Sequence, residues 1–404
     1  MRSIVFTEQY FYPEGWSGAQ LTRDIVCALQ EDGYQVTVVC GSTPYVEPIG
    51  LSADDPTRLG VRIVRLASLA RTRSLLLRAI NHLLYSFQSF VALLAQHKAD
   101  LIIVQTNPPP IVIIAGLVAW ICRKPLVVIA MDLYPEALLA FRPSFANSSV
   151  ARILAMPFAW AYSHARFVVA LGPCMAHRLY RKGVLRNRIR VIPNWATGDL
   201  RVRRGTDNQL LDQWLLRGCF TILYSGSLGI AHEIDTILSS LLQLRADCPD
   251  LRLLCVASGT RLEAAQQAVQ AAELESAVLF RKLVPPELLP DTMGLASLAL
   301  VSMRPGFEGI VVPSKFAGYL ARGIPILYIG PKSDISRFIE DASAGACFAN
   351  GDVQGVCQFL RDVTADPARL RSYGVAAQSY YERHLAIDHG LSAYRGLISD
   401  AILR

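Results

Sequence analysis

The sequence has few cysteines, and their spacing excludes two classes of protein. Nine cysteines are scattered through 404 residues, their number is odd, and no two of them form a Cys-x-x-Cys pair. This pattern supports neither a zinc site nor a disulfide-stapled secreted domain. The cysteines are therefore expected to be small buried apolar residues in a reducing compartment, and no metal site is predicted.

A secretory signal and a membrane-spanning segment are also absent from the pattern. The N-terminal residues MRSIVFTEQY lead directly into a strand-like run and leave no room for a signal peptide. The most apolar segment, 101–131, is interrupted by Asn107, a run of three prolines and the Arg123-Lys124 pair. Its longest unbroken apolar run is well short of the ~20 residues that a span needs. We therefore expect a cytoplasmic protein with strand, loop, helix and strand in this segment.

Apolar residues and positive charge are in excess. The chain is 52% hydrophobic and 18% charged, with a formal net charge of +7. Its length exceeds what one core usually organises, so two domains of roughly 200 residues are expected. The positive charge suits nucleotide phosphates, anionic lipid or nucleic acid. Nucleic acid is the least expected partner, because the basic residues are not interleaved with an aromatic platform.

Short β-branched runs alternate with helical patterns, which predicts βαβ units and parallel sheets. The first series of expected strands is 3–7, 35–40, 61–66, 101–104, 126–130 and 167–170. After a basic stretch, the second series is 220–224, 251–257, 277–280, 298–302, 326–329 and 346–348. The fold class expected is thus α/β, with two doubly wound, Rossmann-like domains at 1–190 and 191–384 and a C-terminal helix, about 385–404, packed back on the first. Ligands bind beyond the carboxyl ends of such strands, so the two edges are expected to face a cleft.

A lysine inside an apolar segment marks the first candidate site. Pro313-Ser314-Lys315 follows an expected strand and is typical of a helix start, with Ser314 as N-cap and Lys315 in the first turn. A cation is unfavourable there unless an anion neutralises it, because the helix dipole is already positive at that end. Lys315 is therefore a candidate phosphate ligand beside free amides. An isolated Ser-Lys pair is equally compatible with a solvated lysine on a surface helix.

Glycines follow the first expected strand of each domain. Gly226 and Gly229, with Ser227 between them, precede an apolar-faced helix, and Gly15 and Gly18 lie in a long loop of the first domain. Glycines at such positions let the backbone approach a diphosphate closely. They also serve ordinary tight turns, so the pattern is weak by itself.

These segments together resemble one family of enzymes. The quoted stretches are EQYFYPEGWSGAQLTRDI, MDLYPEALLA, VIPNWAT, YSGSLGIAHEIDTIL and PGFEGIVVPSKFAGYLARGIPIL. They resemble the family-four retaining glycosyltransferases of the GT-B fold, most closely the bacterial cell-surface polysaccharide branch similar to the colanic-acid enzymes. The resemblance implies metal-independent transfer of a hexosyl group, without a cofactor, from a nucleotide diphosphate sugar held by the second domain to an acceptor held by the first.

The resemblance also implies roles for particular residues. The catalytic residues would be Asp132 and Lys315, with Lys315 replacing a divalent ion. The donor-binding residues would be Gly226, Ser227, Leu228, Gly229, His232, Ser258, Leu283, Glu308, Gly309, Ser314 and Lys315. The acceptor-binding residues would be Glu8, Glu14, Gly15, Gly18, Asp132 and Glu136. Amides at 227–232, taken as a helix start, would stabilise the departing diphosphate. Asp132 is alternatively a helix cap, and Glu8 and Glu14 are alternatively exposed loop carboxylates.

Several positions depart from the family pattern. Met131 stands where many similar enzymes have histidine, and Ile310 and Gly318 stand where they have a pair of glutamates. The second glutamate normally holds the nucleotide ribose, so the ribose contact is left open, with Glu308 as one candidate. Ser227 and His232 replace the usual arginine and lysine. Lys315 is therefore the main remaining cation, and His232 is either a helper or an ordinary surface residue.

The resemblance implies a lipid-linked acceptor, such as a polyprenyl-diphosphate sugar, and peripheral contact with the inner face of the cytoplasmic membrane. A Leu-rich helical run at 68–100, with Arg71, Arg73, Arg78, Phe87 and Phe90, is compatible with a bilayer surface and equally with a core-facing helix. Further arginines near the hinge are candidates for the basic face or for the acceptor's diphosphate: Arg186, Arg188, Arg190, Arg201, Arg203 and Arg204.

Two rival functions remain open from the sequence. A catalytically silent GT-B scaffold would bind a donor without turnover. A sugar-nucleotide epimerase would convert its substrate without an acceptor, but that chemistry needs histidines and acids around the sugar, and the chain has only seven histidines.

Overall fold

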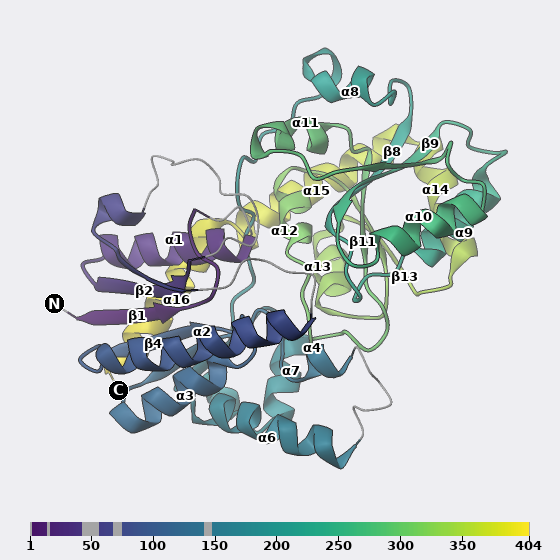
Figure 1. Ribbon diagram of the computed structural model, residues 1–404. Helices are drawn as coiled ribbons and strands as arrows, with labels where there is room; N and C mark the ends of the chain where they lie inside the picture. The colour runs from purple at the N-terminus through teal and green to yellow at the C-terminus, as the bar shows by residue number, and fades with distance from the viewer. Residues whose placement is uncertain (1, 14–16, 43–55, 68–74, 141–147, 404) are drawn as a thin grey trace. The chain divides into compact units, whose positions relative to one another are not determined.

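The computed structural model describes residues 2–13, 17–42, 56–67, 75–140 and 148–403. Two compact units are present (Figure 1). The first comprises Met1–Asn194, Gly309–Val312 and Ile387–Arg404, and the second comprises Trp195–Glu308 and Pro313–Ala386. Each unit is built around one parallel sheet, and each is described separately.

The first unit contains a seven-stranded parallel sheet in the order β3-β2-β1-β4-β5-β6-β7. Its strands are β1 (Ser3–Thr7), β2 (Gln35–Gly41), β3 (Arg62–Leu66), β4 (Leu101–Gln105), β5 (Leu126–Ile129), β6 (Phe167–Ala170) and β7 (Ile189–Val191). The order reverses between β1 and β4. Such a switch point opens a crevice beyond the carboxyl ends of the strands, which is where α/β proteins bind ligands.

Helices cover both faces of this sheet (Figure 1). One face carries α1 (Ser17–Glu31) and α16 (Ile387–Leu403), and Nε of Arg395 on α16 lies 2.7 Å from Oδ2 of Asp32, directly after α1. The other face carries α2 (Leu75–Ala95), α3 (Ile111–Cys122) and α6 (Ser149–His164), as right-handed crossovers require. The remaining elements are η1 (Pro56–Leu59), α4 (Glu136–Leu139), α7 (Pro173–Arg181) and η2 (Arg186–Arg188).

The second unit contains a six-stranded parallel sheet in the order β10-β9-β8-β11-β12-β13. Its strands are β8 (Phe220–Ser227), β9 (Leu251–Ser258), β10 (Val278–Arg281), β11 (Leu298–Ser302), β12 (Ile326–Ile329) and β13 (Gly345–Phe348). Its helices are α8 (Gln209–Gln213), α9 (Asp235–Leu244), α10 (Leu262–Ala271), α11 (Leu289–Gly294), α12 (Lys315–Ala321), α13 (Asp334–Ala342), α14 (Val353–Ala365) and α15 (Pro367–His384), with 3-10 turns η3 (Gly205–Asp207) and η4 (Pro286–Leu288). The switch point lies between β8 and β11.

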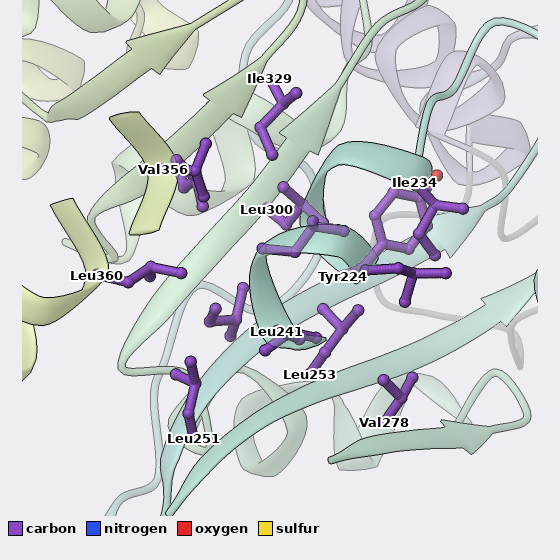
Figure 2. Packing of buried hydrophobic residues seen from close by; sticks show 14 of the residues in the cluster. Tyr224, Ile234, Leu241, Leu251, Leu253, Val278, Leu300, Ile329, Val356 and Leu360 are labelled. Atoms are coloured by element: carbon purple, nitrogen blue, oxygen red, sulfur yellow. The ribbon is translucent and has the colours of Figure 1, made fainter. Parts of the chain in front are cut away.

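The core of the second unit packs strand residues against α9 and α14. Figure 2 shows Leu253 and Leu300 of the sheet beside Leu241 of α9 and Val356 and Leu360 of α14, all buried. Strands of a parallel sheet are covered on both faces, so they consist of nearly continuous apolar residues. This composition made the strands visible in the sequence.

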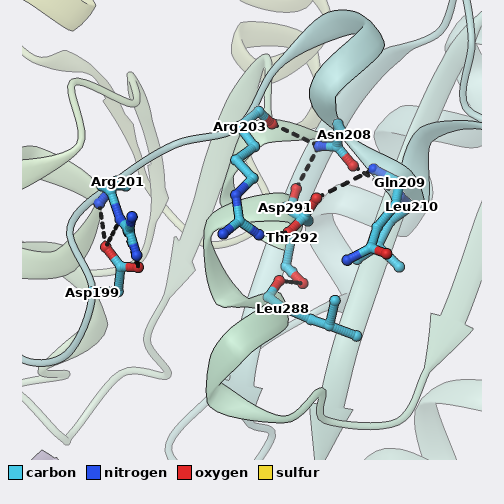
Figure 3. Close-up of polar contacts among 9 residues, drawn as sticks. All are labelled: Asp199, Arg201, Arg203, Asn208, Gln209, Leu210, Leu288, Asp291 and Thr292. Carbon is cyan, nitrogen blue, oxygen red and sulfur yellow. Dashed lines mark hydrogen bonds and ion pairs between the residues drawn. The ribbon is translucent and has the colours of Figure 1, made fainter.

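Hydrogen bonds and ion pairs hold residues 199–209, at the start of the second unit (Figure 3). Arg203 Nη1 donates to Asp291 Oδ2 at 2.7 Å, and the side-chain Nδ2 of Asn208 donates to the carbonyl of Asp291 at 2.7 Å. Arg201 Nη2 contacts Asp199 Oδ2 at 2.7 Å. Two of the arginines suggested for an acceptor diphosphate therefore already have carboxylate partners.

The expected fold class is confirmed, since both sheets are parallel and covered by helices. All twelve expected strands are present, and one further strand, β7, lies inside the basic stretch. In the part of the chain described, no helix combines the length and the apolar character needed to traverse a bilayer.

Candidate functional site

A buried lysine lies at the carboxyl edge of the second sheet. Lys315 is the first residue of α12, and its Nζ lies 3.6 Å from the centroid of the Tyr224 ring on β8. The Nζ atom is buried and has no hydrogen-bond partner among the described residues. Burial lowers the pKa of Lys315 to about 7. A cation–π contact contributes only about 0.5–2 kcal/mol, so it does not replace the hydrogen bonds that an ammonium loses on burial.

The backbone beside this lysine is open to a ligand. Gly226 has φ +121°, which L side chains rarely adopt. A Cβ built at this position would lie 3.8 Å from Lys315 Cε and 3.9 Å from Nζ. Glycine therefore keeps the space next to the ammonium free of a side chain. An anion beside Lys315 would also meet the end of β8 at close range.

The predicted helix start at 227–232 is wrong. Strand β8 continues through Ser227, and α9 begins only at Asp235. Ile234 holds the N-cap position of that helix, and Oε1 of Glu233 accepts from the Thr236 amide at 2.6 Å. The backbone amides at 227–232 therefore lie before the helix and do not form its first turn.

Hydrogen bonds join the loop after β8 to the loop after β9 at the carboxyl edge of the second sheet. The amide of Leu228 donates to the carbonyl of Ser258 at 2.6 Å, and its carbonyl accepts from the Arg261 amide at 3.1 Å. Gly259, with φ +124°, makes the approach possible, since a Cβ there would lie 2.5 Å from the Leu228 carbonyl oxygen. Ser258 and Leu228 are thus brought together as expected donor-side residues, and Gly259 was not anticipated.

His232 is a neutral ring in contact with the same tyrosine. Its Nδ1–H donates to the Ser302 carbonyl at 2.9 Å, and the ring stands edge-on to Tyr224 at 83°. Burial, reinforced by the charge of Lys315, lowers the pKa of His232 to about 3. The ring is half-buried and is held by the Ser302 carbonyl and the Tyr224 ring. With Nδ1 donating, Nε2 is a hydrogen-bond acceptor and not a second cation.

A further basic side chain reaches this region. Arg261, Leu228, His232 and Asp235 are among the residues that line a small cavity of about 20 Å³. Arg261 Nη1 is buried without a hydrogen-bond partner among the described residues. No sequence motif identified Arg261.

The remaining donor-side predictions have mixed outcomes. Ser314 holds the N-cap position, but its side chain makes no capping hydrogen bond. Glu308 Oε1 accepts from the Gly306 amide at 3.0 Å. Leu283 follows β10 and is 46% exposed. Gly229 follows the end of β8, with open space where a Cβ would be.

The structure describes the surroundings of two positions that depart from the family pattern, Ile310 and Gly318. Gly309 and Ile310 are grouped with the first unit, where the Ile310 carbonyl accepts from the Leu133 amide at 2.9 Å. A Cβ at Gly309 would overlap the backbone of Cys174 at 2.6 Å. At Gly318 a Cβ would lie 3.2 Å from Arg322 Nη1, which donates to the Gly318 carbonyl at 2.8 Å.

Asp132 lies beyond the end of β5 in the first unit. Its amide donates to Thr106 Oγ1 at 3.2 Å, and its backbone forms an antiparallel bridge with Val311. Burial raises the pKa of Asp132 to about 6. The helix-cap alternative is wrong, because α4 has Pro135 at its N-cap and no side-chain cap.

Glu136 is paired with a lysine that the sequence did not single out. Lys182 Nζ lies 2.6 Å from Glu136 Oε1 and also donates to the Tyr134 carbonyl at 3.3 Å. Glu136 Oε2 is buried without a hydrogen-bond partner in the described residues. One carboxylate oxygen is thus available beside a fixed cation.

The first loop differs from expectation. Glu8 is only 1% exposed, so the alternative of an exposed loop carboxylate is wrong for it. Gly18 lies within α1 and not in a loop. Glu14 and Gly15 fall outside the described residues. Across the described ranges, no cluster of three or more His, Cys, Asp or Glu side chains is arranged to hold a metal ion.

Sequence comparisons point to one family. Residues 18–195 match the glycosyl transferase 4-like domain. The GDP-mannose-dependent alpha-(1-6)-phosphatidylinositol monomannoside mannosyltransferase of Mycolicibacterium smegmatis is 27% identical over 242 residues, which are 59% of this chain and 59% of that protein. "Probable glycosyltransferase WbjE" of Pseudomonas aeruginosa is 22% identical over 339 residues, 81% of this chain and 82% of the relative.

The fold is shared with a solved protein of low sequence identity. The crystal structure of Anabaena Alr3699/HepE in complex with UDP and glucose superposes with a TM-score of 0.74 and 14% identity, covering 99% of this chain and 100% of that one. At this identity the likeness establishes the fold alone. The chain thus has the GT-B fold, and its residues 18–195 are similar to the glycosyl transferase 4-like domain.

Proposed function

We propose that the protein transfers a hexosyl group from a nucleotide diphosphate sugar to a sugar acceptor with retention of anomeric configuration. The observation that carries this proposal is the buried, unpartnered Nζ of Lys315, which faces the open backbone at Gly226. An ammonium in that position favours a ligand with a diphosphate. No divalent ion is invoked, because Lys315 supplies the positive charge.

In this proposal the second unit binds the donor. Lys315 neutralises the diphosphate, and the backbone from Gly226 to Gly229 approaches it. Negative charge on the diphosphate grows as the sugar departs, so a fixed ammonium stabilises the transition state more than the ground state. Losing Lys315 should therefore lower kcat/KM by the equivalent of about 2–4 kcal/mol.

The first unit binds the acceptor in the same proposal. Asp132 and Glu136 position the acceptor hydroxyl, and the departing phosphate takes its proton. A carboxyl with a pKa of about 6 is mostly ionised at neutral pH, so Asp132 is available to accept a hydrogen bond or to assist as a base. Glu136, held by Lys182, orients the acceptor.

We further propose that the acceptor is a polyprenyl-diphosphate-linked sugar and that the product enters a cell-surface polysaccharide of the colanic-acid kind. The enzyme would then work in the cytoplasm at the inner face of the membrane. A relative named for a phosphatidylinositol monomannoside acceptor, together with the net charge of +7, supports a lipid-linked acceptor.

A ligand screen tests the proposal. Uridine and guanosine diphosphate sugars both belong in it, because one relative is solved with UDP and another is named for GDP-mannose. A donor that binds the folded state raises the melting temperature, and transfer is then followed by NMR of the anomeric proton. Retention of the donor's anomeric configuration supports the proposal. Binding without transfer indicates a silent scaffold, and conversion of the sugar without an acceptor indicates an epimerase.

A further inference from the structure

Three neighbouring helices of the first unit expose an unusual number of large apolar side chains. In the described ranges, 24 large hydrophobic residues are exposed, and 12 of them lie on α2, α3 and α6. These 12 define the apolar helix face: Leu77, Ile80, Leu83, Leu84, Phe87, Val91, Trp120, Ile121, Val150, Ile153, Leu154 and Met156. Helix α3 contacts both α2 and α6, so the three helices form one continuous layer on one side of the sheet (Figure 1).

The exposure does not result from poor packing against the sheet. On α2 the opposite side is buried, where Tyr85, Ser89 and Leu93 are at most 1% exposed and Tyr85 Oη donates to the Val39 carbonyl at 3.4 Å. Outward-facing Phe87 and Trp120 are nevertheless 67% and 66% exposed. The outer side of a covering helix is normally polar. Apolar patches beyond a few hundred Å² usually mark an interaction surface.

The charge on this layer has one sign. Helices α2, α3 and α6 contain no aspartate or glutamate. A basic rim runs along the amino ends of strands β4 to β7, next to the same helices: Lys98, Arg123, Lys124, Arg166, Arg188 and Arg190. The acid in that rim, Asp100, accepts the Ser3 amide at 2.8 Å. Apolar residues bordered by cations complement a surface that is apolar inside and anionic outside.

A hollow at the junction of α3 and α6 combines both properties. Its volume is about 630 Å³, and Trp120, Ile121, Arg123, Lys124 and His164 are among its lining residues. An aromatic ring, an aliphatic side chain and three basic groups in one hollow match a phosphate headgroup and the first carbons of its acyl chains. The hollow lies at the amino end of β5, whereas Asp132 lies beyond the carboxyl end of that strand.

We propose that the apolar helix face lies in the interface of an anionic lipid bilayer, with the basic rim and the α3–α6 hollow contacting lipid phosphates. A second copy of the chain is a poorer occupant, since its own face would bring cations against cations. The inference deepens the proposed function, which places the acceptor in a membrane, and it names three helices where the sequence pointed to one. Of the arginines expected to assist, Arg71 and Arg73 lie outside the described residues.

Flotation of the full chain with vesicles tests this proposal without donor or acceptor. Vesicles of phosphatidylcholine alone are compared with vesicles that also contain phosphatidylglycerol. The apolar variants are Leu83→Ser with Phe87→Ser and, separately, Ile153→Ser with Met156→Ser. Val375→Ser is the matched control, because Val375 is 71% exposed on helix α15 of the second unit.

Wild type should float mainly with the anionic vesicles. Each apolar pair should lower the partition coefficient at least about tenfold, which corresponds to about 1.4 kcal/mol, and the control should not change it. Replacing Arg123 and Lys124 by glutamine should remove the preference for phosphatidylglycerol. Circular dichroism melting verifies that each variant is folded.

Other results would overturn the proposal. They are flotation of the apolar variants at the wild-type level, equal binding to both vesicle types, or a loss of self-association by the variants with no change in flotation. Donor binding by the Phe87→Ser variant is measured in parallel. Unchanged donor affinity with lost flotation separates the membrane surface from the catalytic proposal, so each can fail independently.

Discussion

Replacing Lys315 with methionine should stabilise the ligand-free protein. Methionine fills a similar volume without a charge, and Lys315 Nζ has no hydrogen-bond partner in the part of the chain described. The folded protein therefore holds an ammonium under conditions that disfavour it. Burial is the cause of the lowered pKa, which falls from 10.5 to about 7.

The size of the effect follows from that pKa. A fall from 10.5 to about 7 corresponds to about 5 kcal/mol of destabilisation when the unfolded chain is fully protonated. The variant also loses the contact with the Tyr224 ring, which is worth about 0.5–2 kcal/mol. We therefore expect Lys315→Met to raise the free energy of unfolding by about 3 kcal/mol at or below neutral pH.

The pH dependence has a defined sign. The pKa of Lys315 is lower in the folded state than in the unfolded state, so the cost is fully present below about pH 7. It declines as the pH rises toward 10.5, where both states are neutral. The stability gain of the variant should thus be largest near neutral pH and should shrink in alkaline buffer.

Urea unfolding near pH 7 and near pH 9.5 measures this gain. Lys332→Met is the matched control, because Lys332 is an exposed lysine of the second unit. A variant that is less stable than wild type at both pH values, or a gain that does not change with pH, would refute the reasoning. In either case the ammonium would not be buried as described.

Three further predictions concern residues of the first unit and of the second unit. Asp132→Asn should impair turnover far more than donor affinity and should remove an acidic limb near pH 6 from the rate profile, because the carboxylate must be ionised; equal losses measured by calorimetry and kinetics would argue against it. Gly226→Ala should weaken donor binding at least about tenfold, since φ is +121°, whereas Gly229→Ala, with open space around it, should be mild; similar affinities for both variants would contradict this. With glycine at 318, wild type should bind ribose and deoxyribose donors within about tenfold, and a larger ratio of dissociation constants would show that another group holds the ribose.

The sheets were predictable because their strands are buried apolar runs. Such runs are visible locally, and each of the twelve expected strands is present. Strand β7 was not predicted because it lacks such a run. Ile189–Val191 has only three residues, one of them Arg190, and lies in a basic stretch. A short edge strand has too little apolar pattern to stand out.

Helix starts were less predictable than strands. A helix start was expected at 227–232, yet the helix begins at Asp235 with Ile234 at its N-cap. Isoleucine is not among the favoured N-cap residues, so local preference did not indicate this start. Ser314 shows the opposite case, since it has the preferred residue type but makes no capping bond.

The contacts that define the site join residues far apart in the sequence. Lys315, the first residue of α12, contacts Tyr224 of β8, and Lys182, directly after α7, reaches Glu136 of α4. No local sequence pattern predicts contacts of this kind. Gly259 was predictable from the sequence, because a glycine that follows an expected strand closely is a typical turn residue. The exposed apolar residues of α6 could be assigned to the apolar helix face only from the structure, where α3 contacts both α6 and α2.

Calorimetry of donor binding tests the central claim, that Lys315 holds the donor diphosphate. The ligand is the nucleotide diphosphate sugar identified by the screen, titrated near pH 8 in two buffers of different ionisation enthalpy. Free Lys315, with a pKa of about 7, is mostly neutral there, and an adjacent diphosphate favours its protonation. We predict uptake of about one proton by wild type and by Lys332→Gln, and none by Lys315→Gln, whose affinity falls at least about thirtyfold. Unchanged affinity of Lys315→Gln, together with no proton uptake by wild type, would contradict the account.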